Sequence, residues 1–145
     1  NQDLLLALVG SYYAEKYETG MVTTVGASKV VDEKVSKAGG EVFRTKVGDV
    51  NVARRMSEED VLFGGEPSGT WIMDDVHMCP DGTLAAVKVL EMLSESGKAL
   101  SELVSETPTY PIINLDSLNY PHHPLQQYDP HPHHALCPHR NRKNS

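Results

Sequence analysis

Two kinds of apolar spacing alternate along the chain, and this alternation limits the folds that it can adopt. Segments with apolar residues at helical spacing are separated by short runs of strand-forming residues. We expect helices near residues 3–18, 30–38, 47–55, 83–96 and 101–104, and strands at 21–25, 42–45, 61–63 and 71–73. Strands that alternate with helices predict an α/β fold, with a mostly parallel mixed sheet between helices.

The last long helix that we expect has the clearest amphipathic pattern. Leu84, Val87, Leu90 and Leu93 recur at helical spacing and predict one apolar face. The preceding run, residues 74–77, contains two aspartates and a histidine but lacks the closed ligand set of a structural metal site. We interpret that run as a surface turn.

The composition of the chain changes in its last quarter. The 145 residues fit one domain of ordinary size, which we place at residues 1–112. Residues 113–145 are rich in histidine and proline and show little apolar periodicity, which predicts a disordered tail. A shifted reading frame and adventitious metal binding are the alternatives. The metal alternative would use His122, His123, His131, His133, His134 and Cys137.

Charge and targeting signals exclude several classes of function. The formal net charge of −7 argues against a nucleic-acid partner. A small basic cluster of Arg44, Lys46, Arg54 and Arg55 is interpreted as a solvated face, with a phosphate contact as the alternative. No apolar run is long enough to span a membrane, and the first residues do not resemble a signal peptide. Two cysteines are too few for a disulfide framework, so we expect a cytoplasmic protein.

The segment Gly64-Gly65-Glu66-Pro67-Ser68-Gly69-Thr70-Trp71 carries the most chemical information. Its carboxylate can accept hydrogen bonds from two neighbouring hydroxyls, and the serine hydroxyl both donates and accepts. Flanking glycines let the backbone approach a ligand closely. These properties suit binding to adjacent hydroxyls of a sugar ring. A plain strand-to-strand turn is the alternative, because glycine, proline and serine are common turn residues.

Two further loops are expected beside this one. In parallel sheets, ligand-binding loops follow the carboxyl ends of the strands. Residues 26–28, 46–49 and 65–70 each follow an expected strand, so we expect the three loops to lie at one edge.

Four stretches of the chain resemble one enzyme family. The run "FGGEPSGTWI" resembles the sugar-recognition loop of the α-D-phosphohexomutases, which include phosphoglucosamine and phosphomannose mutases. The runs "DLLLALVG", "RTKVGDVNVARRM" and "CPDGTLAAVKVLEML" resemble the elements around that loop, in the right order and spacing. The resemblance covers residues 3–110 and is greatest to archaeal-type phosphoglucosamine mutases.

The resemblance implies that this chain is the third of four domains. In the family, a phosphoserine in the first domain carries the phosphoryl group, an aspartate-rich loop in the second binds Mg²⁺, and a loop in the fourth holds phosphate. We find no counterpart of these parts, so we expect no catalytic and no metal-binding residue in this chain. The implied partners are the other domains of the enzyme and a hexose or hexosamine phosphate. The implied reaction is the conversion of glucosamine 6-phosphate to its 1-phosphate, with the isolated fragment inactive.

The resemblance also assigns substrate contacts. Glu66 and Ser68 match the glutamate and serine that contact sugar hydroxyls in the family, whereas Thr70 stands where many members have histidine. Asp49 and Gly26 replace a histidine and a lysine of the phosphomannomutase branch, which favours a glucosamine-type site. The residues expected to bind substrate are Glu66, Ser68, Gly69, Thr70, Asp49, Gly48 and Ser28.

Asp49 has two interpretations. Its carboxylate could attract the ammonium of an amino sugar, or it could be the N-cap of a helix that begins at Val50.

The function of the whole chain also has two interpretations. The first is the sugar-recognition domain of a phosphohexomutase, and the second is a stand-alone, non-catalytic sugar-phosphate-binding or scaffold module. The serine and aspartate loops in the same polypeptide would distinguish the two.

Overall fold

The computed structural model describes residues 2–110. The expected tail at 113–145 and its candidate metal ligands lie outside the described residues. The elements are α1 (Gln2–Tyr17), β1 (Met21–Thr24), α2 (Lys29–Lys37), β2 (Val42–Thr45), α3 (Asp49–Glu59), β3 (Phe63–Gly65), β4 (Trp71–Met73), β5 (His77–Pro80), α4 (Gly82–Ser96) and α5 (Leu100–Ser105).

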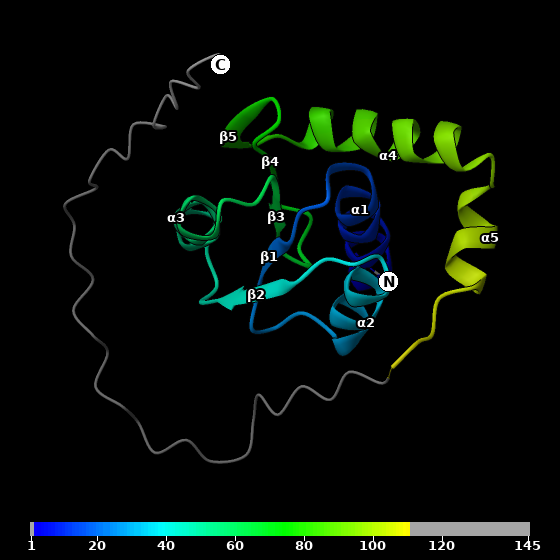
Figure 1. Cartoon of the computed structure of the whole chain (residues 1–145), viewed down its shortest axis with the longest axis horizontal. Coiled ribbons are helices and arrows are strands. Elements are labelled where there is room, and N and C mark those ends of the chain that lie inside the picture. Colours follow the sequence, from blue (N-terminus) through cyan, green and yellow to red (C-terminus); the bar gives the residue numbers. More distant parts are fainter. Residues whose placement is uncertain (1, 111–145) are drawn as a thin grey trace. The chain divides into compact units, whose positions relative to one another are not determined.

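The five strands form one mixed sheet in the order β2-β1-β3-β4-β5 (Figure 1). Strand β1 is parallel to β2 and to β3, whereas β4 is antiparallel to both of its neighbours. The predicted α/β class and mixed sheet are therefore confirmed, with the pairings divided equally between parallel and antiparallel.

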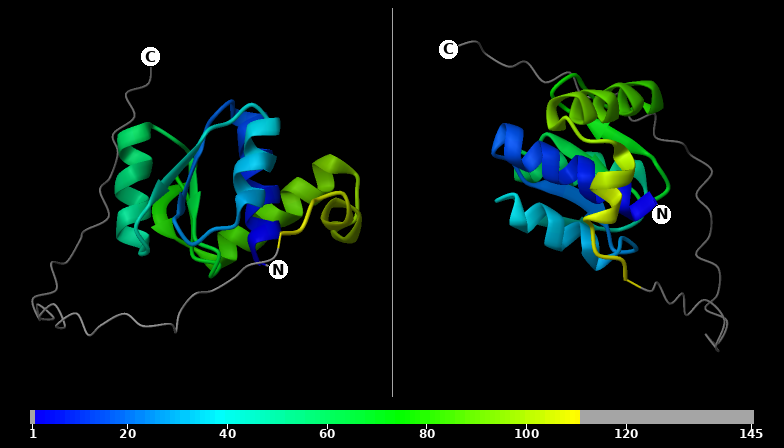
Figure 2. Two further views of the ribbon diagram at one scale, coloured as in Figure 1. Left: turned by 90° about the horizontal axis from the view of Figure 1, so that it is seen from below. Right: turned by 90° about the vertical axis from the view of Figure 1, so that its right-hand side faces the viewer.

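Helices cover both faces of this sheet (Figures 1 and 2). Helices α1 and α2 pack on one face, where Met21 of β1 joins their apolar residues in a buried cluster. Helix α3 covers the other face, where Val22 packs with Val52 and Met56. Consecutive residues of β1 thus enter opposite clusters, because successive side chains of a strand point to opposite faces.

Helix α1 is apolar on almost all sides. Its buried residues are Asp3, Leu4, Leu6, Ala7, Leu8, Val9, Gly10, Tyr13 and Ala14. A Cβ at Gly10 would meet the Sδ atom of Met21 at 2.4 Å, so glycine allows the helix to lie close to β1. A helix that is apolar all round is typical of a central position in the core. In the described part of the chain, no helix combines the length and the apolar composition needed to cross a bilayer.

The prediction for α4 was correct for the helix and partly wrong for its face. The buried residues are Ala85, Lys88 and Met92. Val87 and Leu90 are 54% and 66% exposed, although helical spacing predicted that both face the core.

Strand β5 was not predicted. Residues 74–76 form the expected turn, but the chain pairs with β4 from His77 onward. The run HMCP lacks an alternating apolar pattern and ends in proline, which is tolerated at a sheet edge.

Candidate functional site

The three loops predicted to share an edge begin side by side. Thr24 pairs with Thr45, and Thr23 pairs with Gly65, so β1, β2 and β3 end at one edge of the sheet. The loops that follow them start at residues 25, 46 and 66. Thr23 reinforces this edge, because its buried hydroxyl donates to the carbonyl of Gly65 at 2.8 Å.

The loop after β3 is a tight turn. The N–H of Glu66 donates to the carbonyl of Thr70 at 3.0 Å, and the N–H of Gly69 donates to the carbonyl of Glu66 at 3.0 Å. Gly69 has a φ of +97°, a region that disfavours residues with a side chain. The alternative of a strand-to-strand turn is therefore correct for the backbone, and the turn presents polar side chains.

Oxygen atoms of three side chains follow one another along this turn. The Oε2 atom of Glu66 lies 3.3 Å from the hydroxyl oxygen of Ser68, which lies 3.4 Å from that of Thr70. Ser68 is exposed, and the other two are partly exposed. A carboxylate beside two hydroxyls both accepts and donates hydrogen bonds, so the row can match adjacent hydroxyls of a sugar.

The loop after β2 contacts the Glu66 side chain directly. The backbone N–H of Gly48 donates to the Oε1 atom of Glu66 at 2.6 Å. Gly48 is the N-cap of α3, has a φ of +122° and offers no side chain to cap the helix. The carboxylate of Glu66 therefore also accepts a hydrogen bond at the N-terminus of α3.

Asp49 is the first residue of α3, not its N-cap. Its exposed carboxylate accepts the N–H of Val50 at 2.8 Å. The helix begins one residue before Val50, the start assumed in the N-cap interpretation, because Gly48 takes the cap position. Asp49 directly follows Gly48, the residue that donates to Glu66.

Ser28 stabilises the N-terminus of α2. It is the N-cap of α2 and accepts the N–H of Val30 at 3.4 Å, while its own N–H donates to Asp3 at 2.9 Å. Its hydroxyl thus stabilises a helix end, whereas Gly48 and Ser68 each donate a hydrogen bond to Glu66.

Arg44 holds the loop after β1, a role that the sequence did not indicate. Its guanidinium donates to the carbonyls of Thr24 at 3.2 Å and Ala27 at 2.9 Å, and forms an ion pair with Asp32. The interpretation of Arg44 as part of a solvated face is therefore wrong. Arg55 pairs with Glu59 at 2.7 Å on its own helix.

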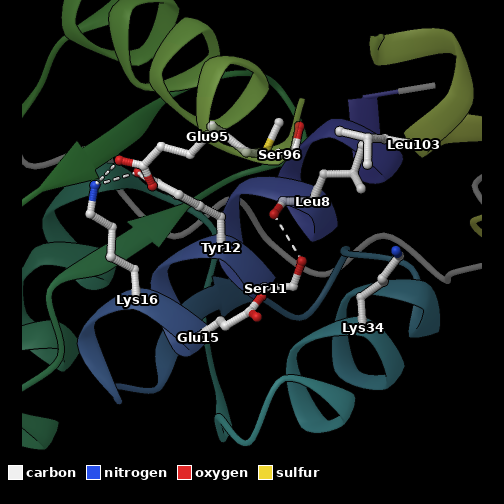
Figure 3. A pocket seen from close by; sticks show the side chains of 10 residues that line it. Leu8, Ser11, Tyr12, Glu15, Lys16, Lys34, Glu95, Ser96 and Leu103 are labelled. Atoms are coloured by element: carbon white, nitrogen blue, oxygen red, sulfur yellow. Dashed lines mark hydrogen bonds and ion pairs between the residues drawn. The ribbon is translucent and has the colours of Figure 1, made fainter. Parts of the chain in front are cut away.

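A concavity of about 450 Å³ lies between α1, α2, α4 and α5 (Figure 3). The hydroxyl of Ser11 donates to the carbonyl of Leu8 at 2.9 Å. Lys16 and Tyr12 both contact Glu95, at 2.7 and 2.9 Å. Because these polar groups bind one another across its wall, the concavity lacks a convergent set for a ligand.

A buried charged cluster lies at the opposite edge of the sheet. Asp75 accepts the hydroxyl of Tyr13 at 2.9 Å and the ammonium of Lys88 at 2.7 Å. Burial, together with the hydrogen bond to Asp75, raises the pKa of Tyr13. Burial lowers the pKa of Lys88, but its bonds to Asp75 and Glu91 outweigh this and raise it overall. The cluster joins α1, the β4–β5 turn and α4.

Metal binding finds no support in the part of the chain that the structure describes. No group of three or more histidine, cysteine, aspartate or glutamate side chains in residues 2–110 is arranged to hold a metal ion.

Helices on both faces of one central sheet define a three-layer α/β/α domain. Residues 1–110 match the family model described as phosphoglucomutase/phosphomannomutase, alpha/beta/alpha domain III. The chain therefore belongs to the phosphoglucomutase/phosphomannomutase family, as a third domain.

Relatives from archaea support this assignment. The chain is 54% identical over 112 residues to the "Probable phosphoglucosamine mutase" of Methanopyrus kandleri, covering 77% of this chain and 25% of the relative. It is 50% identical over 116 residues to the phosphoglucosamine mutase of Methanocaldococcus jannaschii, covering 78% and 25%. The chain thus spans about a quarter of the length of these relatives.

A solved structure shares the fold. A phosphoglucomutase/phosphomannomutase family protein from Burkholderia thailandensis superposes with a TM-score of 0.63 at 23% identity, covering 74% of this chain and 24% of the other. This likeness concerns the fold alone.

Proposed function

We propose that this domain recognises the sugar of a hexose or hexosamine phosphate within a phosphohexomutase. The observation that carries the proposal is the row of Glu66, Ser68 and Thr70 oxygen atoms on a tight turn. Glucosamine phosphate is the substrate that we favour, because the relatives of highest identity given above are named phosphoglucosamine mutases.

Glu66 and Ser68 orient the sugar. The carboxylate accepts hydrogen bonds from two adjacent hydroxyls of the ring, and Ser68 donates to or accepts from one of them. A mutase must bind its substrate in two orientations, so contacts to hydroxyls common to both serve each half of the reaction. These contacts accelerate the reaction by positioning the substrate, because a well-oriented reactant avoids much of the entropic cost of the reaction.

The phosphoryl chemistry belongs to other domains of the same polypeptide. A phosphoserine in such a domain would donate its phosphoryl group to the sugar phosphate, and Mg²⁺ held there would supply charge stabilisation. This chain supplies no step of that transfer. Its contribution is to hold the sugar ring while the phosphoryl group is transferred to or from either of the two phosphorylated positions.

Asp49 favours an amino sugar. Its exposed carboxylate follows Gly48, whose N–H binds Glu66, so a second anion lies at the same edge. An ammonium group on the sugar gains Coulomb energy from such an anion. We expect Asp49→Asn to reduce the preference for glucosamine 6-phosphate over glucose 6-phosphate, and an unchanged preference would remove Asp49 from the proposal.

A domain exchange tests the whole proposal. Residues 1–110 replace the third domain of the Methanocaldococcus jannaschii phosphoglucosamine mutase, and conversion of glucosamine 6-phosphate is measured. We expect an active chimaera. Two lost hydrogen bonds to a charged group, each worth about 1.5–3 kcal/mol, predict that Glu66→Ala lowers kcat/KM about 10²- to 10⁴-fold.

The matched control is Glu41→Ala, which removes an exposed carboxylate just before β2, at the other edge of the sheet. It should leave kcat/KM unchanged. Equal activity of Glu66→Ala and the parent would refute sugar recognition by this loop. An inactive but folded chimaera, with sugar phosphate still bound by the 145-residue chain, would favour the stand-alone module.

A cytoplasmic location is part of the same proposal. Phosphorylated sugars are charged and do not pass through a bilayer unaided, so an enzyme that uses them works where they are made. Cell fractionation with an antibody to this chain tests the location.

A further inference from the structure

Trp71 lies directly beneath the Glu66 turn. It is the first residue of β4 and pairs with Gly65, the residue before Glu66. The indole is 6% exposed and meets the ring of Phe63 edge-on, with centroids 5.9 Å apart. Phe63 in turn stacks on Tyr13 at 4.9 Å. Three aromatic rings in contact therefore hold the indole in place.

The indole contacts the backbone where the turn begins. A Cβ at Gly65 would lie 2.5 Å from the Cδ1 atom of Trp71, so the glycine admits the ring at this distance and a side chain would not. This contact with Gly65 leaves the indole N–H close to Glu66, the residue that follows Gly65.

The indole N–H binds the carbonyl of Glu66. The Nε1 atom of Trp71 donates to this carbonyl at 3.2 Å, and the N–H of Gly69 donates to the same carbonyl at 3.0 Å. Both acceptor sites of the oxygen are therefore engaged. At the other end of the residue, Gly48 holds the carboxylate at 2.6 Å. Glu66 is fixed at its backbone from inside the domain and at its side chain from the neighbouring loop.

We infer that Trp71 is the positioning residue for Glu66, an inference that rests on the proposed sugar-binding role of that residue. The buried indole orients the Glu66 peptide through its N–H while the remainder of the ring fills the core. Without the N–H, the carbonyl keeps only the bond from Gly69, and the turn opens more often. A sugar phosphate then binds to a turn that is ordered for a smaller fraction of the time.

The chain offers a clean way to remove this one hydrogen bond. Trp71 is its only tryptophan, so expression with β-(3-benzothienyl)alanine in place of tryptophan changes this position alone. The analogue keeps the size and aromatic character of the indole and replaces the N–H by sulfur. Amide exchange of Gly69 and Glu66 is measured by NMR in the 145-residue chain, and binding of glucosamine 6-phosphate is measured by titration.

A net hydrogen bond of about 0.5–1.5 kcal/mol corresponds to a two- to tenfold effect. We expect amide exchange of Gly69 to be faster by about that factor, and affinity for glucosamine 6-phosphate to be weaker by a similar factor. The matched control is Tyr13→Phe, which removes a hydrogen bond of the same aromatic cluster at the opposite edge of the sheet. It should lower the melting temperature and leave both the exchange of Gly69 and the affinity unchanged.

The two readouts separate the possible failures. Unchanged Gly69 exchange and affinity in the analogue would overturn the positioning role and leave Trp71 as a packing residue. Equal losses in the analogue and in Tyr13→Phe would also overturn it, because the effect would then be one of general stability. Faster Gly69 exchange in a chain that binds no sugar phosphate would support the turn's dependence on Trp71 and count against the proposed function instead.

Discussion

The Oε1 atom of Glu66 accepts the backbone N–H of Gly48 at 2.6 Å, across 18 positions of the sequence. One carboxylate oxygen thereby joins the loop after β3 to the N-terminus of α3, where Gly48 cannot supply a side-chain cap. Anions near a helix N-terminus gain roughly 0.3–1 kcal/mol from the helix dipole. The other oxygen faces Ser68. The proposed ligand-binding residue is thus also part of the scaffold.

Glu66→Ala should therefore change stability as well as sugar binding. We expect the free energy of unfolding to fall by about 1–2 kcal/mol, as for the loss of a helix cap, with faster amide exchange at Gly48. Glu66→Gln, whose amide oxygen can still accept, should lose less. Urea denaturation measures the free energy of unfolding, and NMR measures the amide exchange of Gly48. Unchanged exchange of Gly48 in Glu66→Ala would contradict the capping role.

Gly48→Ala should strain the loop after β2. The φ of +122° is costly for a residue with a side chain, and a Cβ would lie 3.3 Å from the Nδ2 atom of Asn51. We expect about 1–3 kcal/mol of destabilisation. Gly26→Ala is the matched control in a neighbouring loop, where a Cβ meets nothing within 4 Å. Chemical denaturation compares the two, and equal costs would argue against strain at Gly48.

Lys88→Met should be severely destabilising. The Lys88 side chain is 9% exposed and forms an ion pair with Asp75 at 2.7 Å, so its loss leaves a carboxylate unpaired in the interior. Breaking a buried pair in this way costs about 3–5 kcal/mol.

Lys98→Met makes the same chemical change at the surface. The Lys98 side chain is 47% exposed and pairs with Glu106 at 2.7 Å. Exposed pairs contribute about 0–1 kcal/mol. Denaturation curves of the two variants should differ strongly, and similar midpoints would show that water reaches the Asp75 pair.

Asp81 should make stability depend on pH in the acid range. It is the N-cap of α4, and the N–H of Leu84, with a smaller contribution from His77, holds the pKa of its carboxyl below the usual value. A pKa that is lower in the folded state stabilises the protein above the unfolded pKa of about 4. This contribution is lost as the pH falls through the folded pKa.

Asp81→Asn keeps a good cap and removes the titration. Its free energy of unfolding should therefore fall less between pH 6 and pH 3 than that of the parent, as measured by urea denaturation at each pH. His77→Ala should retain most of the dependence, because the Leu84 amide is the main cause. An identical pH dependence in Asp81→Asn would contradict the assignment.

Local sequence patterns predicted the elements that are themselves local. Strand-forming runs and helical spacing predicted the α/β class, and Gly64–Thr70 predicted a turn with polar side chains. The same patterns failed where burial depends on distant partners. Val87 and Leu90 have the spacing of a core face but are exposed, whereas Lys88 is buried and pairs with Asp75 of the β4–β5 turn. Strand β5 needed the edge of β4 before its short run could pair.

The sequence by itself determined which residue types stand together in the candidate site, because carboxylate, hydroxyl and glycine residues occur in one short loop. Only the tertiary structure decided how they are held. Gly48 reaches Glu66 because β1 lies between β2 and β3 and brings their carboxyl ends to one edge. Trp71 reaches the Glu66 carbonyl because β4 folds back along β3. Such contacts depend on strand order and register, which non-local hydrogen bonds set and local spacing does not contain.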